Sequence, residues 1–509
     1  MKIASVTFSL VGILGLSLSS QAVAAERPMT LAETIELATK HNLDVQIERY
    51  NPRLAVYNLE GLYGAYDPGV SFSGEHSHDE AGSRLLGGGF SVPGSTSDQD
   101  AFGIGLGGAN GGSGLLPWGM TYSARGNVND TYGDSFGINN GNLVVDPFEN
   151  SSGSASLTLT QPLLKNFWID GTRLNIRLAK NNVKWTEQAF KQRLMDIVNL
   201  TEQTYYELIA AREFVIAQQK AVELAERLLT ENKKRVEVGA MAPLDEKQAE
   251  SQAASSRADL LVAKNAVAVR EDLLKSYITD EYAKYASVKI VPSEPLRAQR
   301  QFFDRQDSWS KGLASRPDYA QAKIDLESAG IQIKYTKNQL LPQVDIFGTF
   351  GYNGSGDEFN QAIGEVRDMN SPFWRYGGQI TIPIGNTSAK NSYRASKATR
   401  EKAVLTLKRT EQSLMVQIDE AINQARSSFE RVEATAAASS FAAAALDAEE
   451  KKLASGKSTS FEVLSLQRDL TTARNAEIRA LVDYNKALAQ LAFAEGTLLE
   501  RRGITVTVK

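Results

Sequence analysis

The sequence contains no cysteine among its 509 residues, and histidine occurs only three times. The absence of cysteine excludes disulfide bonds, thiolate metal sites and a lipid attached to an N-terminal cysteine. The formal net charge of −4 does not favour a nucleic-acid partner, because nucleic acids attract basic surfaces. With no convincing acid/base constellation, the sequence predicts neither an enzyme nor a bound cofactor or metal.

Long apolar runs are also absent beyond the N-terminus. Residues 1–25 are typical of a secretory signal peptide, with Lys2, an apolar core and a small-residue cleavage site. After this segment, no stretch of about 20 consecutive apolar residues could form a membrane-spanning helix. The sequence therefore predicts an exported chain without a helical membrane anchor.

Helix-breaking residues are missing from two very long stretches. Neither proline nor glycine occurs in residues 172–238 or in residues 386–455. Since a helix rises about 1.5 Å per residue, the second stretch could reach roughly 100 Å. Its apolar residues recur at steps of three, four and seven, as in a coiled-coil stripe: Leu407, Leu414, Ile418, Ala421, Ala425, Phe429, Val432 and Ala436. A second break-free run follows each stretch, which predicts two long helical hairpins, 172–275 and 386–497.

The predicted hairpins turn at Gly239 (within 239–243) and at Gly456. Glycine suits a chain reversal because it tolerates the left-handed backbone conformation. In both hairpins an acidic residue, Asp245 or Glu462, lies six positions after the glycine. The repeated spacing indicates that the two turns are equivalent.

The hairpins belong to a longer internal repeat. The prolines before them, Pro162 and Pro383, are 221 residues apart, and the turn glycines are 217 residues apart. The sequence thus predicts a division into five parts: signal peptide 1–25, first repeat 26–275, linker 276–315, second repeat 316–498 and a short C-terminal tail 499–509.

Within each repeat, the spacing of apolar residues changes from the 3.6-residue period of a helix to the 2-residue period of a strand. Val344, Ile346 and Phe350, for example, alternate with polar neighbours. Runs of this kind approach the nine to eleven residues that a tilted strand needs to cross a bilayer, and the alternation is typical of a transmembrane β-barrel. Four strands per chain are predicted: about 68–80, 152–161, 342–353 and 373–383. The inserted residues at about 85–150 are rich in Gly, Ser, Asn and Asp, and are expected to form an extracellular loop with room for a short hairpin.

Four strands cannot close a barrel, because the smallest membrane barrels have about eight. Open edges in lipid would leave several kcal/mol of unsatisfied hydrogen bonding per backbone group. The chain is therefore expected to associate with copies of itself in the membrane lipid, and a cyclic trimer would supply twelve strands.

The sequence at this point resembles the TolC-like outer-membrane efflux protein family. The resemblance is carried by three motifs and the two glycine turns, and it covers nearly the whole mature chain: LAETIELA at 31–38 with Asn42, LLPQV at 340–344 and FEVLSL at 461–466. It implies a mainly α fold with a membrane β-barrel part. In such a homotrimer, a 12-stranded β-barrel continues into a 12-helix periplasmic α-barrel, located in the cell outer membrane.

The resemblance also implies a function and its residues. The chain would be the outer-membrane exit duct of a tripartite efflux or secretion system, working with a periplasmic adaptor and an inner-membrane transporter. Carried over to this sequence, the turns at Gly239 and Gly456 would contact the adaptor, and Asp245 and Glu462 would form an acidic gate. Arg235 and Lys452, the basic residues in the last helical turn before each glycine, would restrain neighbouring hairpins. Where some relatives have a second gate acid, this chain has Ser465, which leaves open whether a second acidic ring exists.

Several alternatives stay open on the residues alone. Asp245 and Glu462 could be ordinary first-turn acids, which the helix dipole stabilises by about 0.3–1 kcal/mol. His76 and His78 share one strand face, where a solvated strand end is favoured over a metal site. The competing protein class is a non-conducting periplasmic coiled-coil scaffold. Within the duct class, export of proteins or peptides competes with efflux of small molecules.

Overall fold

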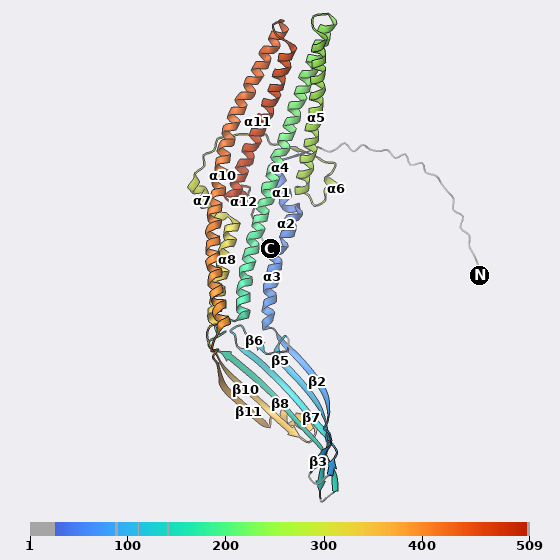
Figure 1. Ribbon diagram of the computed structural model, residues 1–509, viewed down its shortest axis with the longest axis vertical. Coiled ribbons are helices and arrows are strands. Elements are labelled where there is room, and N and C mark those ends of the chain that lie inside the picture. The colour runs from blue at the N-terminus through green and yellow to red at the C-terminus, as the bar shows by residue number, and fades with distance from the viewer. Residues whose placement is uncertain (1–25, 87–89, 110, 140–141, 506–509) are drawn as a thin grey trace, which may run out of the picture. The chain divides into compact units, whose positions relative to one another are not determined.

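The computed structural model describes residues 26–86, 90–109, 111–139 and 142–505 (Figure 1). The predicted signal peptide lies outside the described residues. The chain forms two compact units, each assembled from three separate segments. Unit 1 takes residues up to 46, 196–303 and 421–493, and unit 2 takes residues 47–195, 304–420 and those from 494 onward. Each unit therefore draws on both predicted repeats.

Four long helices dominate the chain. Helices α4 (Gly171–Glu237) and α10 (Thr387–Ala454) have 67 and 68 residues, and each contributes to both units. Helices α5 (Pro243–Ile278) and α11 (Ser460–Ala494) follow them after short turns. The long helices predicted from the missing helix breakers are thus confirmed. Among the described residues, no helix has an apolar stretch long enough to cross a membrane.

Unit 1 also contains a small parallel sheet that brings distant segments together. Strand β1 (Glu26–Met29) pairs with β9 (Lys289–Pro292). The Tyr205 hydroxyl of α4, fully buried, donates a 2.9 Å hydrogen bond to the Met29 carbonyl. The short helices α1 (Leu31–His41) and α6 (Tyr282–Tyr285) belong to the unit as well, and α2 (Leu43–Glu48) contributes residues to both units.

The helical part of unit 2 is held by a buried arginine. Arg316 lies between α7 (Arg305–Ser315) and α8 (Pro317–Asn338). Its guanidinium binds the Asp318 carboxylate at 2.6 Å, the Gln417 amide oxygen at 3.1 Å and the Ala494 carbonyl at 3.3 Å. The remaining small helices of unit 2 are α3 (Tyr50–Tyr63), the 3-10 turn η1 (Gly64–Tyr66), α9 (Phe359–Arg367) and α12 (Leu498–Arg501).

The sheet of unit 2 is larger than the sequence predicted. Its six long strands lie in the order β11-β10-β8-β7-β5-β2, all antiparallel, and a short β6 (Gly114–Leu115) pairs with β7. The long strands are β2 (Pro68–Glu80), β5 (Thr96–Gly108), β7 (Thr121–Asn139), β8 (Asn142–Pro162), β10 (Gln343–Gly356) and β11 (Ser371–Thr381). A separate hairpin, β3 (Arg84–Leu86) and β4 (Phe90–Val92), precedes β5.

The prediction of four strands per chain was therefore wrong. The insertion at about 85–150 supplies β5 and β7, and it extends β8 beyond the predicted 152–161. Its composition conceals the strands because β5 alternates large apolar residues with glycine: Phe102, Ile104 and Leu106 stand between Gly103, Gly105 and Gly107. Glycine is usually depleted in strands, so the sequence predicts a loop with at most a short hairpin here instead of two full-length strands.

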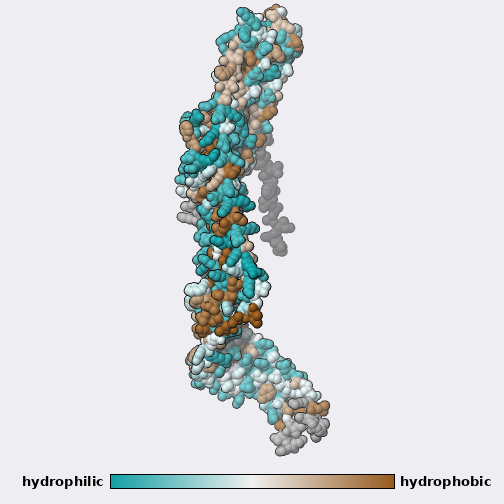
Figure 2. Space-filling model, turned by 60° about the vertical axis from the view of Figure 1, so that its left-hand side comes forward, coloured by the Kyte–Doolittle hydropathy of each residue, from teal (hydrophilic) through white to brown (hydrophobic). Residues whose placement is uncertain are grey.

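The two faces of this sheet differ in chemistry. Directly paired residues share a face. Following the pairing from β2 to β11, one face carries large, solvent-exposed apolar side chains: Val70, Phe72, Phe102, Ile104, Leu106, Leu157, Leu159, Ile346, Phe350, Trp374, Tyr376 and Ile380. The opposite face is mainly polar: Ser71, Ser73, Arg125, Asn127, Ser154, Ser156, Thr158, Thr349, Arg375 and Gln379. In Figure 2, the surface of the strands is largely hydrophilic in the face shown.

Helix α9 packs on the apolar face at one end of the strands. Gly354 of β10 and Gly153 of β8 are paired there, and both lie against α9. A Cβ on Gly354 would be 2.2 Å from the carbonyl oxygen of Ala362, which is fully buried. The Phe359 ring meets the Phe102 ring edge-on, with centroids 5.6 Å apart. The two glycines thus allow the helix backbone to approach the sheet.

Candidate functional site at the hairpin turns

The two hairpin turns, both in unit 1, have the same backbone geometry. Gly239 and Gly456 have φ values of 71° and 74°, so both adopt the left-handed conformation expected of a turn glycine. The Ala240 N–H donates to the Arg235 carbonyl at 2.8 Å, and the Lys457 N–H donates to the Lys452 carbonyl at 2.9 Å. This is the hydrogen bond that closes a helix C-terminus before a reversal.

Arg235 and Lys452 therefore occupy equivalent positions in the backbone, but their side chains make different contacts. The Arg235 guanidinium reaches from the first hairpin to the Leu453 carbonyl of the second, at the 3.5 Å limit of a hydrogen bond. Lys452 instead binds Glu449 of its own helix at 2.8 Å. Of these two basic residues, Arg235 therefore reaches the other hairpin, whereas Lys452 stays with its own helix.

The second turn carries a local ionic cluster. The Ser458 hydroxyl and the Lys452 ammonium donate to the two oxygens of Glu449, at 2.5 Å and 2.8 Å. The hydrogen bonds from Lys452 and Ser458 lower the pKa of Glu449, and the hydrogen bond to Glu449 raises the pKa of Lys452. Both groups are therefore charged at neutral pH, and they hold the end of α10 against the turn.

A buried polar bridge joins the hairpins just inside the turns. Asn232 of α4 and Ser460 of α11 are each 1% exposed. The Ser460 hydroxyl donates to the Asn232 side-chain oxygen at 3.1 Å, and the Asn232 amide donates to the Asp245 carbonyl at 3.3 Å. Sequence reasoning missed this bridge. Its signal was present, because Asn232 interrupts an apolar stripe at the spacing of Leu224 and Leu228.

The predicted gate acids lie in the first turns of the returning helices. Asp245 is half-buried near the start of α5, and Glu462 is exposed near the start of α11. The Glu462 N–H donates to the Thr459 hydroxyl at 3.4 Å. Both acids stand at a helix N-terminus, whose dipole favours their negative charge. The positions fit either a gate or ordinary first-turn acids, so the gate role stays a prediction.

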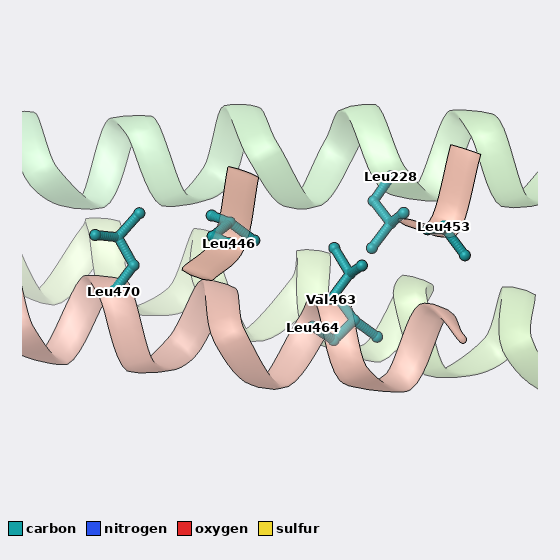
Figure 3. Packing of buried hydrophobic residues seen from close by; sticks show 6 residues of the cluster. All are labelled: Leu228, Leu446, Leu453, Val463, Leu464 and Leu470. Atoms are coloured by element: carbon teal, nitrogen blue, oxygen red, sulfur yellow. The ribbon is translucent and has the colours of Figure 1, made fainter. Parts of the chain in front are cut away.

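An apolar cluster lies behind the turns and fixes their spacing. It joins α4, α10 and α11 through six buried residues (Figure 3): Leu228, Leu446, Leu453, Val463, Leu464 and Leu470. Beside it lies a groove of about 240 Å³, half of whose lining residues are polar or charged: Arg227, Glu231, Arg235, Glu450 and Gln467. Arg227 and Glu450 form an ion pair across the groove at 3.4 Å.

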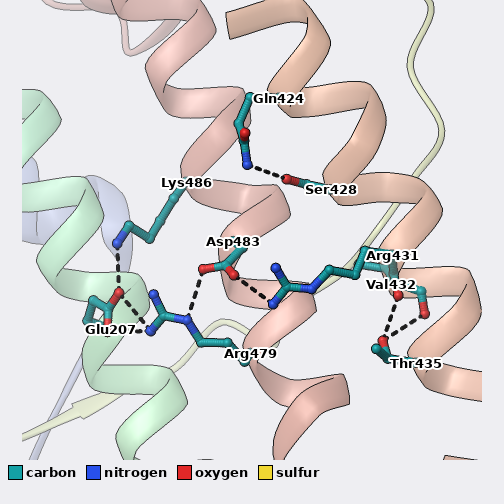
Figure 4. Close-up of polar contacts among 9 residues, drawn as sticks. All are labelled: Glu207, Gln424, Ser428, Arg431, Val432, Thr435, Arg479, Asp483 and Lys486. Carbon is teal, nitrogen blue, oxygen red and sulfur yellow. Dashed lines mark hydrogen bonds and ion pairs between the residues drawn. The ribbon is translucent and has the colours of Figure 1, made fainter. Parts of the chain in front are cut away.

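A second ionic cluster connects the hairpins farther along α4 (Figure 4). Glu207, whose side chain is 13% exposed, binds Lys486 at 2.7 Å and Arg479 at 3.1 Å. Arg479 also binds Asp483 at 3.0 Å, and Asp483 binds Arg431 of α10 at 3.0 Å. Burial acts to raise the pKa of Glu207, but hydrogen bonds and charge from Lys486 and Arg479 outweigh it and lower the pKa overall. Sequence reasoning did not find this cluster.

The metal alternative for the two histidines gains no support from the geometry. His76 and His78 each bind an aspartate of the neighbouring strand, Asp100 at 2.8 Å and Asp98 at 2.6 Å. Both rings are more than half exposed. In the part of the chain that the structure describes, no group of three metal-ligating side chains is suitably placed.

Comparison with known proteins identifies relatives of the whole arrangement. A family model described as "Outer membrane efflux protein" matches residues 120–278 and 309–497. Outer membrane protein TolC of Vibrio cholerae is 24% identical over 368 residues, which are 70% of this chain and 79% of that protein. Outer membrane efflux protein BepC of Brucella suis is 26% identical over 384 residues, 72% and 76% of the two chains. The crystal structure of the Campylobacter jejuni CmeC outer membrane channel has the same fold, with a TM-score of 0.63 at 17% identity over 98% of this chain and 94% of that one.

Proposed function

Because this chain belongs to the outer membrane efflux protein family, we propose that it is the exit duct of a tripartite efflux or secretion system. Its location is the cell outer membrane, and its relatives are channel proteins rather than enzymes. In the proposed role, the duct passively conducts substrates to the cell exterior. An inner-membrane transporter supplies the energy, and a periplasmic adaptor connects the two.

The observation that carries this proposal is the two-faced sheet. Its apolar face suits the lipid of the membrane, and its polar face suits the wall of an aqueous channel. A periplasmic scaffold has no use for exposed aromatic side chains such as Trp374 and Tyr376. The sheet of one chain is open, and unpaired strand edges do not persist in lipid. Copies of the chain must therefore close it, and we propose a homotrimer with rotational symmetry.

The hairpins would form the periplasmic part of the duct, with their turns at the entrance. The turns at Gly239 and Gly456 would contact the adaptor, and Arg235 and Lys452 would restrain neighbouring hairpins. Three copies of Asp245 and Glu462 would place six carboxylates around the opening. Such a concentration of negative charge favours cations in a narrow aqueous pore. The role of the two acids rests on their repeated position and on their place at the helix N-termini.

The test is planar-bilayer conductance of the purified mature protein, with its mass in detergent measured alongside. We expect a trimer that gives small, cation-preferring channels. Asp245→Asn combined with Glu462→Gln is expected to reduce the cation preference and change the conductance. Asp259→Asn with Asp469→Asn is the matched control, since both residues are exposed acids on the same two helices.

The outcomes separate the proposed roles. A monomer, or a protein that never inserts, would contradict the duct and favour the coiled-coil scaffold. A conducting trimer whose selectivity is the same in the gate variant and in wild type would remove the gate role only. Partner pull-down from the native membrane would then identify the adaptor, and would distinguish small-molecule efflux from protein or peptide export.

A further inference from the structure

We propose that each copy of this chain supplies six strands to the barrel wall, so that a closed trimer has eighteen strands instead of twelve. The seam between copies is then formed by the free edge of β2 and the free edge of β11 in the neighbouring copy. These two strands are the ends of the observed sheet. The inference rests on the proposed trimeric duct and adds its strand number and its subunit interface.

The inserted strands are integral parts of the sheet. Strand β5 pairs with β2 from Pro68–Gly108 to Glu80–Thr96, and with β7 from Leu106–Ala124 to Thr96–Asp134. Strands β2, β5 and β7 have 13, 13 and 19 residues. Each exceeds the nine to eleven residues that a tilted strand needs to cross the hydrocarbon layer. All three are therefore long enough to belong to the membrane wall.

The side chains of β2 and β5 also match the wall in chemistry. Phe72 and Phe102 are 78% and 52% exposed on the apolar face. Leu106 of β5 pairs with Val70 of β2. On the other side of β5, the same face of the sheet stays apolar through β7 as far as Leu157 of β8. Removing such a side chain from water is favourable in proportion to the apolar area that is buried. An extracellular loop in water would forgo this stabilisation, so the apolar face of β2 and β5 indicates contact with lipid.

A twelve-stranded trimer would require the sheet to come apart. The four strands predicted from the sequence would close it only if β2 paired directly with β8, whose edge is already occupied by β7. The family match begins at residue 120, so β7, β8, β10 and β11 lie within it, whereas β2 and β5 precede it. If only the four matched strands closed the barrel, the edge of β7 would have to pair with β11 of the next copy. That edge is already occupied by β5. Breaking the β5–β7 ladder would leave backbone N–H and C=O groups in lipid without hydrogen-bond partners, which is strongly unfavourable.

Six strands per chain would make the channel wider than four strands per chain. Barrel diameter grows roughly in proportion to strand number, and barrels of about 16–18 strands enclose an aqueous channel. A wall of eighteen strands would be about 1.5 times as wide as one of twelve. The polar side chains that β2 and β7 contribute to its lining include Ser71, Ser73 and Asn127. In such a duct the barrel is not the narrow point.

The seam can be tested by cross-linking because the chain has no cysteine. Ser71→Cys or Ser73→Cys on β2 is combined with Gln379→Cys or Thr381→Cys on β11, all on the polar face near one end of the strands. The competing seam is tested with Ser123→Cys or Arg125→Cys on β7 and the same two positions on β11. Asn127→Cys combined with Ser154→Cys is the control for disulfide formation within one chain. These residues are paired in the sheet, and the Ser154 Oγ atom lies 2.5 Å from the Asn127 Oδ1 atom.

The measurement is oxidation of the trimer in lipid vesicles, followed by a non-reducing gel. We expect covalent dimers and trimers from at least one β2–β11 pair and none from any β7–β11 pair. Covalent dimers from β7–β11 would overturn the proposal. So would the absence of an intermolecular band from every β2–β11 pair, in preparations where the control disulfide forms. A conducting trimer with the β7–β11 seam leaves the duct intact, whereas loss of the trimer in wild type contradicts the duct itself.

Electron cryo-microscopy of the wild-type trimer gives a second measurement that needs no variant. Eighteen strands in cross-section would support the proposal, and twelve would reject it.

Discussion

The side chains of Ser460 and Asn232 are joined by a 3.1 Å hydrogen bond, although they belong to different hairpins and lie 228 positions apart in the sequence. Both residues are almost completely buried. Asn232 also donates to the Asp245 carbonyl, so one amide connects α4, α5 and α11 at the turns. A buried polar group that loses its partner costs about 1–3 kcal/mol, which makes this bridge a strong constraint on the spacing of the two turns.

The first prediction concerns this bridge. Asn232→Ala is expected to destabilise the paired turns by about 1–3 kcal/mol, because Ser460 and the Asp245 carbonyl lose a buried partner. Amide hydrogen exchange of residues 455–462 should become faster. Thr230→Ala on the same helix is the control, since its hydroxyl bonds only to the backbone carbonyl one turn earlier. Equal exchange in the two variants would show that the bridge does not hold the turns.

The second prediction concerns the turn glycines. Gly239→Ala and Gly456→Ala should each cost about 1–2 kcal/mol in unfolding free energy, because a Cβ disfavours the left-handed conformation. No atom lies within 4 Å of either added Cβ, so the backbone conformation alone accounts for the cost. Gly330→Ala within α8 has the same free space, and it should leave stability equal or higher because alanine favours helix. Denaturant unfolding compares the three variants, and equal stabilities would refute the conformational argument.

The third prediction is a pH dependence at Glu207. Its folded-state pKa lies below the ordinary value of 4.5. The ionised carboxylate therefore stabilises the folded chain above pH 4.5, and this contribution is lost as the pH falls through the lowered pKa. Glu207→Gln should cost about 1–2 kcal/mol at neutral pH, since the pairs are only partly buried. The difference from wild type should shrink towards pH 3.

A matched variant on the same helix controls for charge removal. Glu223 pairs with Lys220 on the exposed surface, where solvent screens the pair, so Glu223→Gln should leave the unfolding free energy nearly unchanged. Urea unfolding between pH 3 and pH 7 measures both variants. A Glu207→Gln difference that does not depend on pH would mean that the cluster acts through packing rather than charge.

The fourth prediction concerns the packing of α9 against the sheet. Gly354→Ala should displace α9, because the added Cβ would meet the Ala362 carbonyl at 2.2 Å, and overpacking of this kind costs about 1–3 kcal/mol. Gly348→Ala lies on the same strand and face with no atom within 4 Å, and should leave α9 in place. Limited proteolysis of residues 357–370 in the folded protein reports the difference. Equal cleavage of the two variants would contradict this contact.

The features that sequence alone predicted are local ones. Missing helix breakers and regular apolar spacing determine the long helices, and glycine at each reversal predicts its left-handed backbone, as Gly239 and Gly456 show. The predicted number of strands was wrong for a local reason, because glycine alternates with Phe102, Ile104 and Leu106 in β5. The pairing of Asn232 with Ser460 could not be predicted, because it depends on how two helices far apart in the sequence are rotated against each other. Of the two predicted basic residues, Arg235 reaches the other hairpin, and Lys452 stays with its own helix.

The parallel pairing of β1 with β9 has a consequence for the order in which the protein can fold. Glu26 and its neighbours have no sheet partner until Lys289 and the residues after it are available. Unit 1 is not complete until residues 421–493 have also arrived. Contacts this far apart in the sequence form slowly, because the intervening chain must lose conformational entropy before they can form. During secretion, strand β1 must therefore wait unpaired until residues 289–292 have followed it, and unit 1 stays incomplete until residues 421–493 arrive. Protection from aggregation and proteolysis in that interval becomes a requirement for the assembly of this protein.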